Sequence, residues 1–211
     1  MSIWFVPRDA AARSMGADAV ANALEARGET VIRNGSRGML WMEPLVERAE
    51  ERHGPRVGWS NVSAGQIDAG LPDEQSDNFM GAVEEVDYLA KQNRWIYERV
   101  GITDPVDPED YLAHGGLTGL KNALAMSGGD VVQAVTDSGL RGRGGAGFPA
   151  GIKWRTVADQ PPAPHAGESQ NAPAHKYICV NADEGDSGTF ADRMLMEGDP
   201  FCLLEGMTIA A

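Results

Sequence analysis

Residues 138–154 read SGLRGRGGAGFPAGIKW, and no other stretch says as much about the fold and ligand of this chain. Six of the seventeen residues are glycine, and Arg141, Arg143 and Lys153 add positive charge. Glycine can adopt left-handed backbone conformations and approach a ligand closely, so successive N–H groups can converge on an anion. Phe148 adds a flat face for stacking. We therefore expect a cradle for a phosphorylated aromatic ligand, a nucleotide or a flavin. The alternative is a mobile glycine-rich linker.

The two common phosphate-binding motifs do not account for this stretch. Gly142–Gly147 formally satisfies G-x-G-x-x-G, but residues 130–137 before it look as much like a helix as a strand. The acidic ribose ligand is expected about 20 residues later, where the chain has Pro161 and Pro164. A P-loop is excluded because no Gly-Lys-Ser/Thr sequence closes the loop. A glycine nest followed by a helix N-terminus remains as the phosphate-binding device.

A polar cluster directly follows an apolar run further along the chain. Residues 176–180 predict a strand, and Asn181, Asp183 and Glu184 follow at its carboxyl end. Ligands of α/β sheets bind at that end of the strands. A tight Asx-rich turn is the alternative. Beside the glycine loop, a binding site is the favoured interpretation.

The composition limits the class of partner. A formal net charge of -13 argues against a nucleic-acid-binding surface, which needs a basic footprint. Residues 1–9 lack the basic and apolar regions of a secretory signal, and no apolar run approaches the length that spans a bilayer. We therefore expect a cytoplasmic chain with no nucleic-acid partner and no membrane insertion.

Cysteine and histidine usage predicts no metal site. Cys179 and Cys202 are too few for a disulfide framework or for a four-thiolate iron–sulfur site within the chain. The histidines show no metal-ligand spacing to one another or to the cysteines. We interpret all four as ordinary surface or loop residues: His53, His114, His165 and His175.

Hydrophobic patterning suggests two modules joined by a connector. The first is a small α/β module, in which Asp9 caps a helix over residues 10–26. The connector contains one long helix over residues 79–100. The second module begins at Tyr111 and ends in an apolar helix that starts at Pro200. The other expected elements are strands at residues 3–6, 29–33 and 39–42, and helices near residues 116–126 and 130–137.

The two motifs, in this order, resemble the flavin-bearing, NADH-oxidising subunit of respiratory complex I. Its relatives in NAD-dependent hydrogenases and formate dehydrogenases share these motifs. The resemblance covers about residues 92–211. Residues 99–105 and 110–116 favour the soluble diaphorase subunits, and the best match is the beta subunit of a molybdenum- or tungsten-dependent, NAD-reducing formate dehydrogenase. The residues that carry it are Gly139–Pro149, Gly151, Lys153, Trp154, Asn181–Glu184, Gly188–Phe190, Asp192 and Arg193.

The resemblance implies an α/β fold in three parts. Residues 1–70 would form a thioredoxin-like domain that lacks cluster cysteines, and residues 71–110 a helical connector. Residues 111–211 would be the first part of an FMN- and NAD-binding domain of the complex I type, incomplete at its C-terminus. The family's 4Fe–4S cluster is expected only in the part that would follow. The implied partners are the formate dehydrogenase alpha subunit and a small thioredoxin-like 2Fe–2S gamma subunit.

The resemblance also assigns roles to residues. The glycine loop and Lys153 would hold the FMN phosphate, and Phe148 would stack on the adenine of NAD. Asp186 stands where complex I proteins usually have a glutamate near the nicotinamide, and is a possible modulator of hydride transfer. No side chain is itself expected to be catalytic, because the flavin carries that chemistry. The implied cofactor-binding residues are Gly142, Arg143, Gly144, Gly145, Ala146, Gly147, Phe148, Lys153, Asn181, Asp183 and Glu184.

The expected function is that of an NAD-dependent oxidoreductase subunit with diaphorase activity. It would pass electrons reversibly between iron–sulfur clusters and NAD through FMN, in a formate dehydrogenase. The flavin-binding subunit of an NAD-reducing hydrogenase, or of complex I, is the alternative within this class. A truncated, non-catalytic interaction module is the alternative from another class.

Overall fold

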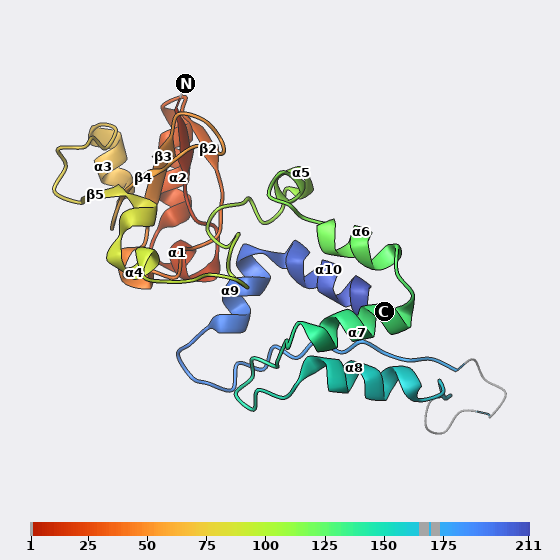
Figure 1. The fold of residues 1–211 in the computed structure, drawn as a ribbon. Coiled ribbons are helices and arrows are strands. Elements are labelled where there is room, and N and C mark those ends of the chain that lie inside the picture. The colour runs from red at the N-terminus through yellow and green to blue at the C-terminus, as the bar shows by residue number, and fades with distance from the viewer. Residues whose placement is uncertain (1, 165–168, 170–173) are drawn as a thin grey trace. The chain divides into compact units, whose positions relative to one another are not determined.

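The structure of the chain is a computed structural model that describes residues 2–164, 169 and 174–211. It divides into two compact units (Figure 1). The first comprises Met1–Gly115 with Gly188–Phe201, and the second comprises Gly116–Ser187 with Cys202–Ala211. The first unit contains a five-stranded sheet and the second contains helices, which confirms the predicted mixed α/β class.

The sheet of the first unit is mixed, with the strand order β2-β1-β3-β4-β5. Strand β1 runs parallel to β2, and all other neighbours are antiparallel. A parallel pair needs a crossover connection, which helices supply here. The predicted strands at residues 3–6 and 29–33 are confirmed. The strands are β1 (Ile3–Phe5), β2 (Thr30–Ile32), β3 (Val46–Ala49), β4 (Val57–Trp59) and β5 (Phe79–Ala82).

The crossover between β1 and β2 begins at Asp9, as predicted. The Asp9 carboxylate accepts hydrogen bonds from the N–H groups of Ala11 (3.0 Å) and Ala12 (3.2 Å), which are otherwise unpaired at a helix start. The expected helix over residues 10–26 is interrupted, giving α1 (Ala10–Ser14) and α2 (Ala17–Ala26). The interruption falls at Gly16, whose φ of 103° is incompatible with a right-handed helix.

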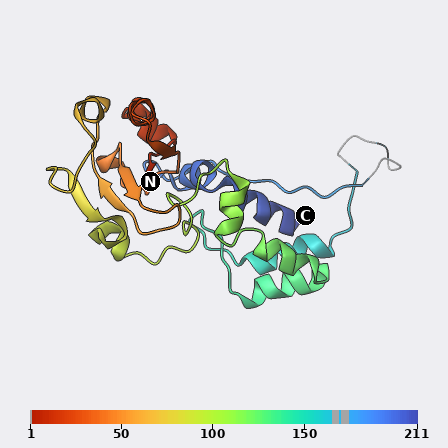
Figure 2. The same cartoon turned by 90° about the horizontal axis from the view of Figure 1, so that it is seen from above.

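Each face of the sheet is covered by a separate apolar cluster. On one face, Trp4 and Trp59 pack with α2 and with Ile67 of α3 (Ala64–Ala69). The other face is covered by η2 (Val83–Glu85) and α4 (Asp87–Ala90). In Figure 2 the red helices and the yellow-green α4 lie on opposite sides of the orange strands. The second cluster contains Met39, Leu45, Val83 and Leu89.

Two predicted elements of this unit are wrong. The expected strand at residues 39–42 is a 3₁₀ turn, η1 (Leu40–Met42), because the strand that pairs with β1 begins only at Val46. The expected helix at residues 79–100 is replaced by β5, η2 and α4. Strand β5 gains its hydrogen bonds from β4, and Gly81 has a φ of 77° that a right-handed helix cannot accommodate.

Buried charges connect the sheet to the loop that follows α4. The guanidinium of Arg37 donates to both carboxylate oxygens of Glu47 (2.8 and 2.9 Å), and Arg56 donates to Glu47 at 3.2 Å. Burial raises the pKa of Glu47, but the two guanidinium groups outweigh burial and hold this pKa below its ordinary value. Arg56 also donates to the carbonyls of Gly101 (3.2 Å) and Ile102 (2.6 Å).

Glu43 is a buried carboxyl without such a countercharge. Its oxygens accept hydrogen bonds from the Ser36 hydroxyl (2.7 Å) and the Leu45 N–H (2.8 Å). Burial raises the pKa of Glu43 to about 7, because these neutral donors do not offset the loss of hydration.

Helix α9 (Ala191–Gly198) belongs to the first unit although it lies late in the sequence. Glu197 accepts a hydrogen bond from the Ala10 N–H at 2.9 Å, and Asp199 pairs with Arg99 at 2.9 Å. A Cβ atom at Gly198 would come within 2.8 Å of Val100, so glycine permits this close approach.

The second unit contains α6 (Thr118–Leu124), α7 (Gly128–Asp137), α8 (Ala150–Asp159) and most of α10 (Pro200–Ala210). All three helices expected in this region are confirmed: those near residues 116–126 and 130–137, and the helix from Pro200. Helices α7 and α8 touch at Gly151, where a Cβ atom would lie 2.4 Å from Thr136 Oγ1. The carboxylate of Glu205 on α10 accepts hydrogen bonds from the N–H groups of Leu117 (2.7 Å) and Leu120 (2.9 Å) at the start of α6.

The predicted strand at residues 176–180 is also wrong. Among the described residues of this unit no strand is present, and the apolar side chains of Tyr177, Ile178 and Val180 are exposed. A strand needs a neighbour to pair its backbone groups, and none of the described strands lies in this unit. No helix within the described part of the chain is long and apolar enough to cross a bilayer.

Candidate functional site

The glycine loop connects α7 to α8 and is closed at its base. Arg141 and Pro149 form an antiparallel bridge, the Gly142 N–H donates to the Phe148 carbonyl (2.8 Å), and the Ala150 N–H donates to the Leu140 carbonyl (2.8 Å). These bonds hold both ends of the loop together directly before the first turn of α8. Residues 143–147 therefore form a projecting tip at a helix N-terminus.

The glycines at the tip of the loop have open space where a side chain would lie. Gly145 and Gly147 have left-handed φ values of 97° and 59°, which favour glycine. A Cβ atom on either of them, or on Gly144, would meet nothing within 4 Å. The three glycines therefore leave open space beside the backbone of the tip. Lys153 lies on α8 one turn behind the loop. These features fit the phosphate end of a flavin nucleotide.

The two arginines of the loop, Arg141 and Arg143, differ in their contacts within the loop. Arg141 is used within the loop, since its guanidinium donates to the Gly147 carbonyl at 2.6 Å. The sequence did not reveal this structural role. Arg143 lies at the tip, beside the open glycines, and its side chain is exposed. Of the two, Arg143 is in the better position to meet a ligand.

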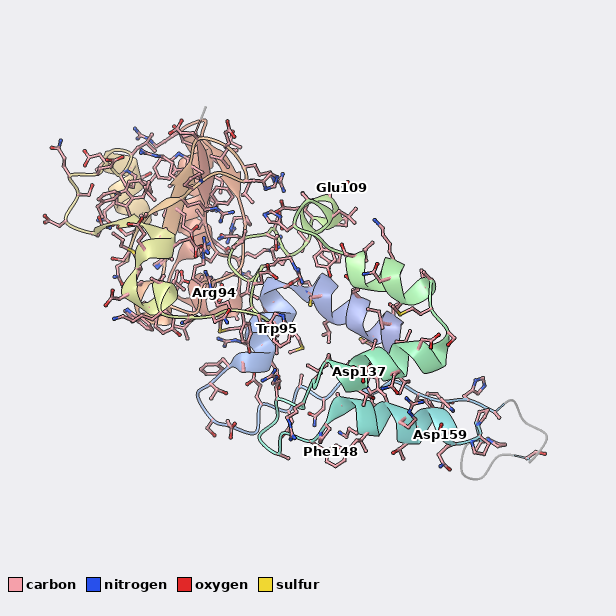
Figure 3. The ribbon with its side chains drawn as sticks, viewed as in Figure 1. Arg94, Trp95, Glu109, Asp137, Phe148 and Asp159 are labelled. Atoms are coloured by element: carbon pink, nitrogen blue, oxygen red, sulfur yellow. The ribbon has the colours of Figure 1, made fainter. Side chains whose placement is uncertain are left out.

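The aromatic member of the predicted site is exposed. Phe148 is 47% accessible, and Figure 3 shows its ring projecting from the N-terminal end of α8, on the side away from α7. An exposed ring at this position can stack on a planar ligand.

The second predicted motif lies in irregular structure within the same unit. Asn181 Oδ1 accepts a hydrogen bond from the Asp183 N–H at 2.9 Å, which is the Asx turn considered as the alternative. Glu184 has a φ of 56°, uncommon for a residue with a side chain, and Asp186 follows in a bend. The Asx turn and the glycine loop are each held by hydrogen bonds of their own. The assignment of both to one site therefore rests on residue type and on the shared unit.

One constellation was missed by sequence reasoning. His53 and His114, interpreted as ordinary residues, have ring centroids 4.8 Å apart and lie beside the buried carboxylate of Asp110. The four-residue spacing of Asp110 and His114 on a helix was the available signal. The approach of His53 depends on the turn between β3 and β4, which the spacing could not reveal. His165 lies outside the described residues.

Comparison with known proteins identifies the domain that contains the predicted site. Residues 135–211 match the family of Nuo51 FMN-binding domains. The match begins within α7 and spans the glycine loop, α8, the Asn181 turn, α9 and α10. This segment is therefore similar to an FMN-binding domain, and it contains both predicted motifs.

Several known proteins are similar to this chain over about half of its length. The chain is 44% identical over 119 residues to the NADP-reducing hydrogenase subunit HndC of Solidesulfovibrio fructosivorans, which covers 56% of this chain and 22% of the relative. It is 45% identical over 102 residues to an NADH-quinone oxidoreductase subunit of Rhizobium meliloti, covering 48% of this chain and 22% of the relative. It is 42% identical over 108 residues to an NADH-quinone oxidoreductase subunit of Escherichia coli, covering 51% of this chain and 22% of the relative. The chain thus spans about a fifth of the length of these relatives.

A solved structure matches over the whole chain, but weakly. This is the NAD⁺-reducing [NiFe]-hydrogenase in its air-oxidized state, at 23% identity and a TM-score of 0.38, covering 100% of this chain and 35% of that chain. This TM-score is too low to support a shared spatial arrangement.

Proposed function

We propose that the chain is the FMN- and NAD-binding part of an electron-transfer subunit with diaphorase activity. The observation that carries this proposal is the match of residues 135–211 to an FMN-binding domain, because this segment contains both predicted motifs. The names of the relatives, an NADP-reducing hydrogenase and NADH-quinone oxidoreductases, support a nicotinamide nucleotide as the second ligand.

The glycine loop and the start of α8 would hold the phosphate of FMN. Gly142, Gly144, Gly145, Ala146 and Gly147 would offer backbone N–H groups, and the helix N-terminus would add a favourable dipole. Arg143 and Lys153 would neutralise the phosphate charge.

The Asn181 turn would hold the remainder of the flavin. Asn181, Asp183 and Glu184 carry the amide and carboxylate groups that suit ribityl hydroxyls and the edge of a flavin ring. Phe148 would stack on the adenine of NAD, and Asp186 would lie near the nicotinamide. Bound FMN supplies hydride exchange with NAD and single-electron exchange with a cluster, whereas the protein contributes binding, orientation and electrostatics.

Within this class we propose the beta subunit of an NAD-dependent formate dehydrogenase. Residues 99–105 and 110–116 support this choice, and the partners would be the molybdenum- or tungsten-containing alpha subunit and the 2Fe–2S gamma subunit. The sheet supports a thioredoxin-like first domain, because in the order β2-β1-β3-β4 only β3 runs antiparallel to the rest. The alternative, a hydrogenase or complex I subunit, is favoured by the names of the relatives.

A spectrum tests the proposal. The protein is purified with its partners, its visible spectrum is recorded, and NADH is added. We expect a flavin spectrum that NADH bleaches. A colourless preparation that binds no FMN would support the non-catalytic interaction module instead. Formate-dependent reduction of NAD then distinguishes a formate dehydrogenase from a hydrogenase or complex I, which would not show it.

A further inference from the structure

Two histidines and an aspartate from distant parts of the sequence meet in the first unit. His53 lies in the turn between β3 and β4. Asp110 lies on α5 (Pro108–Ala113), and His114 lies at the C-terminal end of that helix. One donor atom from each side chain lies within 4.8 Å of the other two. We propose that these three side chains bind a divalent transition-metal ion, with Zn²⁺ as the best fit.

The ligand set suits zinc. Two imidazoles and one carboxylate are ligands that Zn²⁺ accepts, with three protein ligands leaving a fourth position for water. Bonds of about 2.0–2.1 Å place the ligand atoms of a tetrahedral site about 3.3 Å apart. The present cluster is more open, with one ligand atom of each side chain within 4.8 Å of the others and Asp110 Oδ1 at 3.9 Å from His53 Nδ1. His53 is half exposed and can move inward to close the site.

The surroundings already orient two of the three ligands. His114 Nδ1 lies 2.8 Å from the backbone carbonyl of Asp110, a contact that makes this nitrogen a donor and leaves the other ring nitrogen for a metal. The Asp110 side chain is 3% exposed, and its Oδ2 accepts a hydrogen bond from the Asp104 N–H at 2.8 Å. Its Oδ1 faces the histidines. A metal would therefore meet a carboxylate that is fixed in place.

One nearby charge opposes a metal ion. Arg52 Nε lies 3.3 Å from Asp110 Oδ1, and the same guanidinium donates to Asp107 at 2.7 Å. The competing interpretation is therefore an ion-pair cluster without a metal, in which Arg52 neutralises Asp110. The two interpretations predict opposite effects of Arg52. If a metal binds, removal of this positive charge strengthens binding, whereas an ion-pair cluster binds no metal in either form.

Zinc titration of the 211-residue chain, first freed of metal with a chelator, tests the proposal. We expect one ion per chain by calorimetry and, with Co²⁺, the visible absorption of a tetrahedral site. His53→Gln should weaken zinc binding at least tenfold, since it removes a ligand from an exposed position where the fold does not depend on it. His175→Gln is the matched control, because His175 is exposed and lies in the other unit.

Two further measurements make the outcome decisive. Arg52→Gln should tighten zinc binding several-fold, and zinc should raise the melting temperature of the wild-type chain and of His175→Gln but not of His53→Gln. Equal zinc affinities for His53→Gln and His175→Gln would place the ion elsewhere and overturn the proposal. No stoichiometric binding by the wild type would also overturn it, in favour of the ion-pair cluster. Unchanged or weaker binding by Arg52→Gln would contradict the placement of the ion on Asp110.

Discussion

Arg99 and Asp199 form a salt bridge of 2.9 Å across 100 residues of sequence, and the Asp199 side chain is 1% exposed. Arg99 lies in the segment that leads out of the sheet region, and Asp199 directly follows α9. The pair therefore attaches the end of α9 to the first unit. Because Asp199 is buried, loss of its charge would remove a buried ionic interaction with Arg99.

Asp199→Asn should destabilise the first unit. Removing one partner of a buried ion pair costs about 3–5 kcal/mol, and we expect the lower end because the amide retains an acceptor for Arg99. The free energy of unfolding from urea titration measures the effect. Asp68→Asn, on the exposed face of α3, is the control and should change stability by less than about 0.5 kcal/mol. Equal effects of the two variants would show that the salt bridge contributes little.

Lys153→Ala should weaken FMN retention. The substitution removes a positive charge one turn behind the glycine loop, and a charge-assisted hydrogen bond is worth about 1.5–3 kcal/mol, so FMN affinity should fall at least about tenfold. Flavin content after purification and FMN titration of the apoprotein measure this loss. Lys121→Ala on α6, also exposed, is the matched control. Unchanged flavin content in Lys153→Ala would contradict the phosphate-side role of Lys153.

Gly151→Ala should disturb the helix that carries Lys153. A methyl group at residue 151 would lie 2.4 Å from Thr136 Oγ1 and 2.6 Å from Thr136 Cα, so α8 must shift away from α7. We expect a loss of about 1–3 kcal/mol in stability, together with weaker FMN binding. Gly206→Ala is the control, because a Cβ atom on this helical glycine meets nothing within 4 Å. That variant should be neutral or slightly more stable.

Glu43 should make stability depend on pH in a defined window. Its pKa is raised by burial from 4.5 to about 7, so the unfolded chain loses this proton at a lower pH than the folded chain does. Protonated Glu43 therefore contributes its full stabilisation of the folded chain below pH 4.5. This contribution is lost as the pH rises toward 7, and above that pH Glu43 changes the free energy of unfolding no further. The total is on the order of 3 kcal/mol.

Glu43→Gln tests this linkage, because glutamine stays neutral and keeps an acceptor for the Leu45 N–H. The free energy of unfolding of the variant minus that of the wild type should grow between pH 4.5 and 7.5 and then level off. Chemical denaturation at a series of pH values measures this difference. A constant difference across the window would show that burial does not raise the pKa of Glu43, because the folded and unfolded chains would then lose this proton at the same pH.

Local signals in the sequence predicted much of the fold. Asp9 identified the helix start correctly because an Ncap side chain acts on the N–H groups next to it. The apolar run at residues 3–6 identified a strand whose residues Trp4 and Phe5 are buried, and the alternation at residues 29–33 identified its parallel neighbour. The glycine loop was located before α8 because its composition suits a turn and little else.

The errors concern elements that tertiary partners decide. Phe79–Ala82 has apolar residues that also fit a helix, and only pairing with β4 makes it a strand. Residues 176–180 have strand-forming side chains, but no described strand lies beside them. The cluster of His53, Asp110 and His114 depends on where the turn between β3 and β4 comes to lie. Sequence spacing contains none of this information.

The return of residues 188–201 to the first unit has a consequence for synthesis. Residues 116–187 of the second unit separate the two parts of the first, so residues 1–115 leave the ribosome long before Asp199 can reach Arg99. During translation the sheet can form early, whereas the final contacts of the first unit await the end of α9. A nascent chain arrested before residue 198 would therefore lack both the Asp199 partner of Arg99 and the close approach of Gly198 to Val100.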